Sequence, residues 1–263
     1  SIGRCYFFVN LSYFFDRSYF VLYNRLRKDG IPLNKRSAIL FDLDGTLLPM
    51  DLEVYTKTYL NLLGQQLPQF PAQAVVGGVW HGVMAMMKND GSRPNETGFW
   101  DAFSQAMGQD MRATAGDFDT FYRTTFHEVR AVTGENPAAR ELVALAKQRA
   151  ERVILATNPL YPLSAVESRL SWIGLTPQDF DYVTTYAECT FCKPNPRYFT
   201  EVLQRFGLKG EECLVVGNDL QEDGAAARGA GIPVHIVTDC LIPHDLNLDD
   251  FSHSTLAELP NVL

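Results

Sequence analysis

Two aspartates, Asp42 and Asp44, directly follow a short hydrophobic run near the start of the chain. Residues 38–41 read Ala-Ile-Leu-Phe, and the next five are Asp-Leu-Asp-Gly-Thr. Alternate residues at the end of a strand point to the same side, so both carboxylates can reach one pocket. One carboxylate can then attack an electrophile while the other moves protons. A plain turn is the alternative, because Asp and Gly also cluster in turns for local hydrogen-bonding reasons.

The run that carries these aspartates predicts a buried parallel strand with a site at its carboxyl end. Similar runs recur at residues 152–156, 181–185, 213–216 and 233–237, with helix-like segments between them. This alternation predicts an α/β fold with a doubly wound parallel sheet. Functional residues usually gather at the carboxyl ends of such strands.

The segment between the first two predicted strands has a different pattern. Four stretches look like amphipathic helices, with no strand among them: 52–66, 72–87, 96–107 and 117–129. We therefore expect an all-helical inserted domain over residues 51–134. The sheet domain would comprise residues 37–50 and 135–263.

Residues 1–36 are expected to form an N-terminal extension, whose first part is rich in Phe and Tyr and begins at Ser1. Two interpretations stay open. Either residues 1–32 form an aromatic helix that packs on the domain, or they lie outside the natural protein and translation starts near Leu33.

Composition excludes several functional classes. The chain has 263 residues, 46% of them hydrophobic, and 23 Lys and Arg against 31 Asp and Glu give a formal charge of −8. This balance, without a basic run, argues against a nucleic-acid partner. Five cysteines without a disulfide pattern favour a cytoplasmic location, and no apolar run is long enough to predict a membrane span. The sequence does not predict an oligomeric state.

Further polar motifs follow the later predicted strands. Thr157 and Asn158 come after the run 153–156, Lys193 precedes Pro194, and Gly217-Asn218-Asp219 is followed by Asp223. Together with the Asp-Leu-Asp-Gly-Thr motif, they resemble the four motifs of the haloacid dehalogenase-like hydrolases, from about residue 37 to the end of the chain. The resemblance is to the phosphoglycolate phosphatase-like subgroup, which has a helical cap between the first and second motifs. Asn218 departs from the pattern, since many members carry an acidic residue directly after this glycine.

The resemblance implies a role for each matching residue. Asp42 would be the nucleophile and Asp44 the acid/base partner. Mg²⁺ would be bound by the Asp42 carboxylate, the Asp44 backbone carbonyl and Asp219, with Asp223 close by. Which of Asn218, Asp219 and Asp223 contacts the metal stays open. The phosphate-binding residues would be Thr46, Thr157, Asn158 and Lys193.

The implied reaction is hydrolysis of a small-molecule phosphate monoester through an aspartyl-phosphate on Asp42. Asp44 favours this reaction over carbon–halogen cleavage, because dehalogenases of the family are not expected to carry aspartate at that position. A phosphomutase of the same family remains an alternative, since its core residues would be the same. A non-catalytic relative would be expected to have lost Asp42 or Asp44.

Two features of the inserted domain bear on specificity. The polar segment 88–95 lies between two predicted helices, so Lys88, Asn89 and Arg93 are candidate substrate contacts, with a solvated loop as the alternative. Seven aromatic residues are predicted to form the core of the insertion rather than a substrate cage: Trp80, Phe99, Trp100, Phe103, Phe118, Phe121 and Tyr122.

Overall fold

The computed structural model describes residues 35–263, which form one compact unit. Its strands are β1 (Arg36–Phe41), β2 (Ala150–Leu155), β3 (Tyr182–Val183), β4 (Cys213–Gly217), β5 (Val234–Val237) and β6 (Ser252–Ser254). Its α-helices are α2 (Leu52–Leu63), α3 (Ala72–Met87), α4 (Asn95–Met107), α5 (Ala115–Arg123), α6 (Ala139–Arg149), α7 (Leu163–Trp172), α8 (Pro196–Phe206) and α9 (Ala226–Gly229). The predictions for residues 1–34 lie outside the described range.

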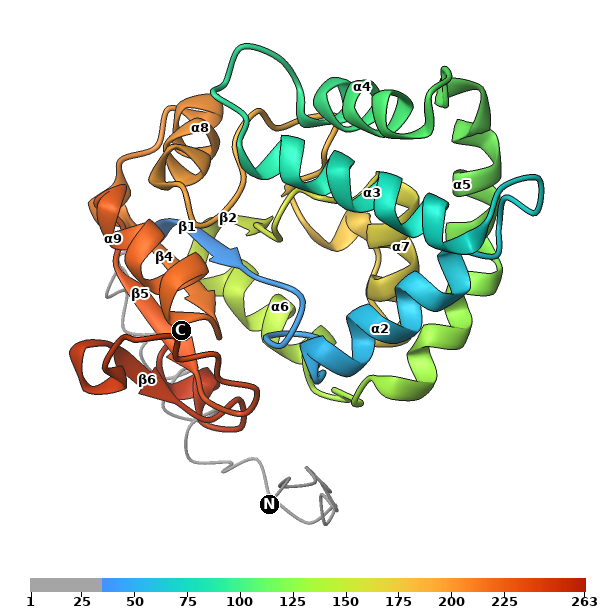
Figure 1. The fold of residues 1–263 in the computed structure, drawn as a ribbon. Coiled ribbons are helices and arrows are strands. Elements are labelled where there is room, and N and C mark those ends of the chain that lie inside the picture. The colour runs from blue at the N-terminus through green and yellow to red at the C-terminus, as the bar shows by residue number, and fades with distance from the viewer. Residues whose placement is uncertain (1–34) are drawn as a thin grey trace, which may run out of the picture. The chain divides into compact units, whose positions relative to one another are not determined.

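Within the described residues, the strands form one parallel sheet of six, in the order β3-β2-β1-β4-β5-β6. β1 lies at its centre, with β2 and β4 on either side (Figure 1). Phe41, the last residue of β1, is in register with Leu155 and Val216. The residues that follow these three strands therefore emerge side by side at the carboxyl-terminal end of the sheet. This arrangement confirms the predicted fold class.

Both faces of the sheet are buried, because successive side chains of a strand point in opposite directions. Ile39 and Phe41 of β1 belong to the hydrophobic core that includes residues of α6 and α7. Ala38 and Leu40 belong to a second core with residues of α8 and α9. The nearly continuous hydrophobic run in β1 is explained by this two-sided burial.

Helices α2 to α5 and the 3-10 helix Thr125–Val132 lie between β1 and β2; we call residues 52–132 the helical insertion. Asp51 caps α2, since its carboxylate accepts the amides of Glu53 and Val54 at 3.0 and 3.1 Å. Close packing of α3 on α4 depends on glycine: a Cβ at Gly82 would lie 2.4 Å from the Phe99 ring. That the insertion acts as a separate cap domain stays a prediction.

Several element ends are shifted by up to three residues from the predicted ones, and two larger differences stand out. The helix expected over 117–129 is divided at Thr124, which separates α5 from the 3-10 helix and has φ −128° and ψ −91°. The short edge strand β6 was not predicted, because its Ser-His-Ser sequence has no hydrophobic signal. Over residues 35–263, we find no helix long and apolar enough to cross a membrane.

Candidate active site

Asp42 occupies the first position after β1, where its backbone amide donates to the Val216 carbonyl of β4 at 2.8 Å. Its carboxylate is held from two sides. Lys193 Nζ donates to Oδ1 at 2.8 Å, and Thr46 Oγ1 donates to Oδ2 at 3.2 Å. The side chain is therefore buried but oriented by two donors, as a nucleophile that must attack from one direction requires.

Lys193 comes from the segment between β3 and α8 and is almost fully buried. Its ammonium group bridges Asp42 and Asp223, with 2.6 Å to Asp223 Oδ1. Burial by itself would lower the pKa of Lys193, but the carboxylates of Asp223 and Asp42 outweigh this effect and raise it. Lys193 therefore remains a cation beside the predicted nucleophile.

The loop after β4 is fixed by its own side chains. Asp223 Oδ2 accepts the backbone amides of Asn218 and Asp219, both at 3.1 Å. The Asn218 side chain accepts from Thr46 at 2.9 Å and donates to the Cys240 carbonyl at 2.7 Å. Gly45 lies against this amide at φ +87°, and a Cβ there would come within 2.3 Å of it. Only glycine fits at this contact.

Asp44 is held by Arg169 of α7, a residue whose role was not predicted from the sequence. The Arg169 guanidinium is fully buried, forms an ion pair with Asp44 Oδ2 and stacks over the Tyr161 ring at 4.3 Å. Asp44 Oδ1 is buried without a hydrogen-bond partner among the described residues. One carboxylate oxygen is therefore anchored while the other is free to exchange a proton.

Thr157 and Asn158 follow β2, as the motif spacing predicts, and both line the same cavity as Asp42 and Asp44. The carbonyl of Thr157 is fixed by Thr184 Oγ1 at 2.7 Å, and Asn158 Nδ2 donates to Glu222 Oε2 at 3.0 Å. The sequence analysis did not single out Glu222. Thr46 and Lys193 are not among the residues that line the cavity; they contact Asp42, and their role in phosphate binding stays a prediction.

The electrostatics of this cluster fit a cation. Burial raises the pKa of Asp42 to about 7 and that of Glu222 to about 8, and it also raises the pKa of Asp44. These carboxyl groups resist ionisation because burial removes water from the charged form, and a bound cation would offset that loss. Carboxylate oxygens are also the ligands that Mg²⁺ prefers.

The segment from Gly217 to Asp223 contains both possible metal ligands and supporting residues. Both oxygens of Asp223 are already engaged by Lys193 and backbone amides, so Asp223 fits a supporting role. Asp219 faces the cavity and contacts His244 Nε2 at 2.9 Å. As the side chains stand in residues 35–263, no three His, Cys, Asp or Glu groups converge on one point.

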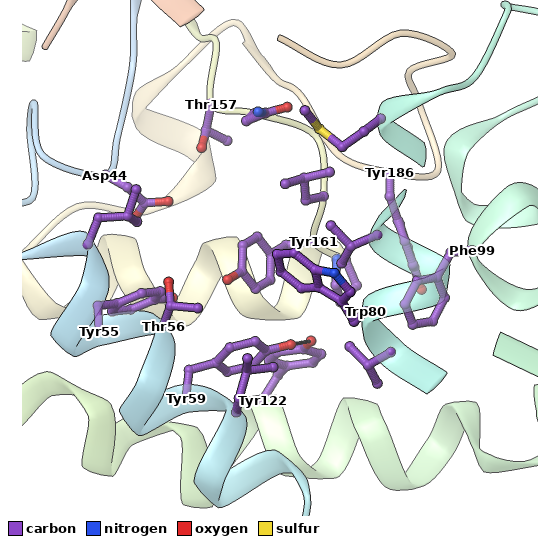
Figure 2. A pocket seen from close by; sticks show the side chains of 18 of the residues that line it. Asp44, Tyr55, Thr56, Tyr59, Trp80, Phe99, Tyr122, Thr157, Tyr161 and Tyr186 are labelled. Carbon is purple, nitrogen blue, oxygen red and sulfur yellow. Dashed lines mark hydrogen bonds between the residues drawn. The ribbon is translucent and has the colours of Figure 1, made fainter. Parts of the chain in front are cut away.

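The cavity extends from these residues beneath the helical insertion and has a volume of about 420 Å³. Figure 2 shows Asp44 and Thr157 at one end, with Phe99 and Tyr186 at the other. Tyr55, Tyr59 and Tyr122 line the wall between these two ends. The two aspartates therefore lie at one end of a chamber that is lined largely by aromatic side chains.

The loop proposed for specificity lies elsewhere. Lys88, Asn89 and Arg93 are not among the residues that line the cavity. Asn89 Nδ2 donates to the Arg93 carbonyl and to Asn95 Oδ1, both at 2.8 Å, and Arg93 pairs with Asp101 in an exposed position. These contacts fit the solvated-loop alternative, and a role in recognition stays a prediction.

The aromatic residues of the insertion serve two purposes. Phe103 and Phe121 are completely buried, which agrees with the predicted core. Phe99, Trp100, Phe118 and Tyr122 are also largely buried but line the cavity, and Trp80 lines it while remaining 53% exposed. Sequence pattern cannot separate these cases, because a cavity wall and a core have the same helical periodicity.

Comparison with known proteins shows which family the sequence of this chain matches. The model of the haloacid dehalogenase-like hydrolases matches residues 37–231. The chain is 28% identical to a phosphoglycolate phosphatase from Photorhabdus laumondii, over 74% of this chain and 77% of the relative. It is 33% identical to a phosphoserine phosphatase from Thermus thermophilus, over 46% of this chain; here the chain spans about half of the relative's length, 50%.

A solved structure of a predicted phosphoglycolate phosphatase from Haemophilus somnus 129PT shares the fold. Its TM-score is 0.52 at 20% identity, covering 89% of this chain and 99% of that structure. The match of the family model covers all the motif residues from Asp42 to Asp223. This chain belongs to the haloacid dehalogenase-like hydrolase family.

Proposed function

We propose that this protein is a Mg²⁺-dependent phosphatase that hydrolyses a small-molecule phosphate monoester through an aspartyl-phosphate. The main support is the pair of aspartates at one end of the cavity. Asp42 is oriented by Lys193 and Thr46, and Asp44 keeps one buried oxygen unengaged. The relatives named as phosphoserine and phosphoglycolate phosphatases support the same reaction class.

In the first step, the Asp42 carboxylate attacks phosphorus and the bond from phosphorus to the ester oxygen breaks. Asp44, protonated at this stage, gives its proton to the leaving oxygen. The raised pKa of Asp44, which burial causes, favours the protonated form that this step needs. Lys193 holds positive charge beside the developing phosphoryl group.

In the second step, Asp44 takes a proton from a water molecule, and the oxygen of that water attacks phosphorus. The bond between phosphorus and Asp42 breaks, which releases phosphate and restores both carboxyl groups to their initial states. Mg²⁺ bound by Asp42, the Asp44 carbonyl and Asp219 would neutralise charge on the phosphoryl oxygens. A cytoplasmic location remains a prediction from composition.

The test measures phosphate release from a set of monoesters with Mg²⁺ or with EDTA. Asp42→Asn should fold normally and lose turnover by several orders of magnitude, on the order of 10⁴-fold or more, because no attacking carboxylate remains. Near-normal turnover by Asp42→Asn would exclude the proposed nucleophile. Asp44→Asn with an activated ester should accumulate phosphorylated Asp42, detectable by mass spectrometry after rapid quench.

The phosphomutase alternative is decided by the product. Transfer to a second hydroxyl would yield an isomerised sugar phosphate and no free phosphate. Hydrolysis yields one phosphate for each molecule of substrate consumed. Phosphorus NMR of the reaction mixture separates the two results.

A further inference from the structure

The chamber beyond the two aspartates has an unusual charge pattern. Every charged side chain that lines it, within residues 35–263, is acidic: Asp42, Asp44, Asp119, Asp219, Glu222 and Asp223. Lys193 and Arg169 are turned to Asp42 and Asp44 from behind the wall. The part of the chamber that would receive a leaving group therefore offers no cation.

This pattern disfavours a leaving group with its own negative charge. An anion that enters the chamber loses hydration, and among residues 35–263 no Lys or Arg lines it; Arg169 stacks on the Tyr161 ring but is already paired with Asp44. Asp119, the acidic residue of the insertion that lines the chamber, is already paired with Arg123 at 3.0 Å. Substrates such as phosphoglycolate, whose leaving group carries a carboxylate, do not match this wall.

The wall is instead suited to an apolar group. Tyr59 and Tyr122 hydrogen-bond to each other at 2.9 Å, while the buried hydroxyl of Tyr55, which also lines the cavity, has no hydrogen-bond partner among the described residues. Tyr161 packs edge-on against Tyr59, with 5.6 Å between ring centroids. These rings present carbon surface to the cavity between Asp44 and Phe99 (Figure 2).

Trp80 of α3 provides the clearest sign of a ligand. It is the most exposed of the large hydrophobic side chains described, at 53%, yet it lines the cavity. Figure 2 shows its indole directed into the chamber beside Tyr161. An aromatic ring left in contact with solvent inside a cavity gains free energy when an apolar group covers it, about 25 cal/mol per Å².

Given the phosphatase activity proposed above, on which this assignment rests, we propose that the substrate is a phosphate monoester of an uncharged, largely apolar alcohol. Its aromatic or branched hydrocarbon part stacks against Trp80 and the Tyr59–Tyr122–Tyr161 rings. The cavity volume of about 420 Å³ exceeds the space that a two-carbon leaving group needs. Trp80 is a specificity-determining residue in this assignment.

The first test compares esters that differ only at the far end of the leaving group. Benzyl phosphate and 4-carboxybenzyl phosphate have similar leaving oxygens, but the second adds a negative charge. We expect kcat/KM to be about 10- to 200-fold higher for benzyl phosphate than for ethyl phosphate. The kcat/KM for benzyl phosphate should also be at least about tenfold higher than the kcat/KM for 4-carboxybenzyl phosphate. Equal or greater kcat/KM for the carboxylated ester or for phosphoglycolate would overturn the assignment.

A second pair tests for a cationic leaving group, since aromatic rings with an acidic neighbour can also bind quaternary ammonium. Phosphocholine and 3,3-dimethylbutyl phosphate have the same shape and differ in this charge. We expect the uncharged ester to be preferred. A clear preference for phosphocholine would contradict the uncharged assignment.

Substitution of Trp80 links the preference to the wall. Trp80→Ala should reduce the ratio of kcat/KM for benzyl over ethyl phosphate by about tenfold, and Trp80→Lys should shift the preference toward 4-carboxybenzyl phosphate. Val54→Ala is the matched control, because Val54 is 45% exposed on α2 and does not line the cavity. An unchanged ratio in both Trp80 variants would exclude Trp80 from recognition.

A binding experiment keeps this inference separate from the proposed reaction. Benzylphosphonate and 4-carboxybenzylphosphonate are not hydrolysed, and calorimetry measures their affinities with or without turnover. Preference for benzylphosphonate without phosphate release from any ester would support the chamber assignment and reject the phosphatase. Phosphate release with no preference between the phosphonates would support the phosphatase and reject the chamber assignment.

Discussion

Replacing Arg169 with methionine tests how the protein holds Asp44. The guanidinium is fully buried, forms an ion pair with Asp44 and also donates from Nε to the Ala165 carbonyl at 3.2 Å. Methionine preserves much of the volume but leaves the Asp44 carboxylate buried without its partner. Removing one member of a buried pair typically destabilises a protein by about 3–5 kcal/mol.

We expect the lower end of that range, about 3 kcal/mol, because Asp44 can take up a proton when its partner is lost. For a domain of this size, that corresponds to a decrease in Tm of about 6–12 °C. Urea unfolding followed by circular dichroism measures the change in free energy. Arg123→Met is the control, since Arg123 pairs with Asp119 and Glu167 in exposed positions and should change stability by less than about 1 kcal/mol.

A double-mutant cycle isolates the pair itself. Asp44→Asn removes the charge with little change in shape, so Arg169→Met should be less destabilising in that background, by about 1 kcal/mol or more. If the two changes were additive within about 0.5 kcal/mol, Arg169 would not be coupled to Asp44 and the structural reasoning would be refuted.

Three further predictions concern other parts of the fold. Because Arg93 pairs with Asp101 at the surface, Lys88→Ala and Arg93→Ala should leave the ratio of kcat/KM between esters unchanged; a loss of about 1–3 kcal/mol for one ester would instead support the recognition role predicted from the sequence. Burial lowers the pKa of His235 from 6.5, so its contribution to stability is complete above pH 6.5 and is lost as the pH falls; the unfolding free energy of the wild type should decrease more than that of His235→Asn in urea titrations between pH 7.5 and 5.5. Gly82→Leu should lower the unfolding free energy by about 1–3 kcal/mol, because Phe99 must move; an unchanged midpoint would show that α3 and α4 are not closely packed there.

The sequence predicted the parts of the site that follow strands. Asp42 directly follows β1, and Thr157 lies shortly after the end of β2. Parallel strands bring such positions to the same end of the sheet. Lys193, from the segment between β3 and α8, contacts Asp42, and Asp223, which follows β4, contacts Lys193. The apolar runs with polar ends therefore predicted the placement of Asp42 and Thr157, whereas Lys193 and Asp223 were predicted from the resemblance to the family's motifs.

Other parts could not be predicted, because their roles depend on packing. Arg169 lies in the middle of α7, where a lone arginine usually marks the exposed face of a helix, yet it is completely buried. Glu222 follows Asp219 in an irregular helical turn without a periodic signal. Trp80 has the spacing of a core residue, and only the position of the cavity separates it from Phe103.

The bridge from Lys193 to Asp42 also constrains the order of events in folding. These residues are 151 positions apart, and Thr46 and Asn218 are 172 apart. Contacts between distant positions form late, because the intervening chain must first lose conformational freedom. Helices α3 and α4, which are neighbours in sequence, can pair much earlier. A nascent or partly refolded chain would thus be able to pair α3 with α4 before it forms the contacts that hold Asp42 and Asn218.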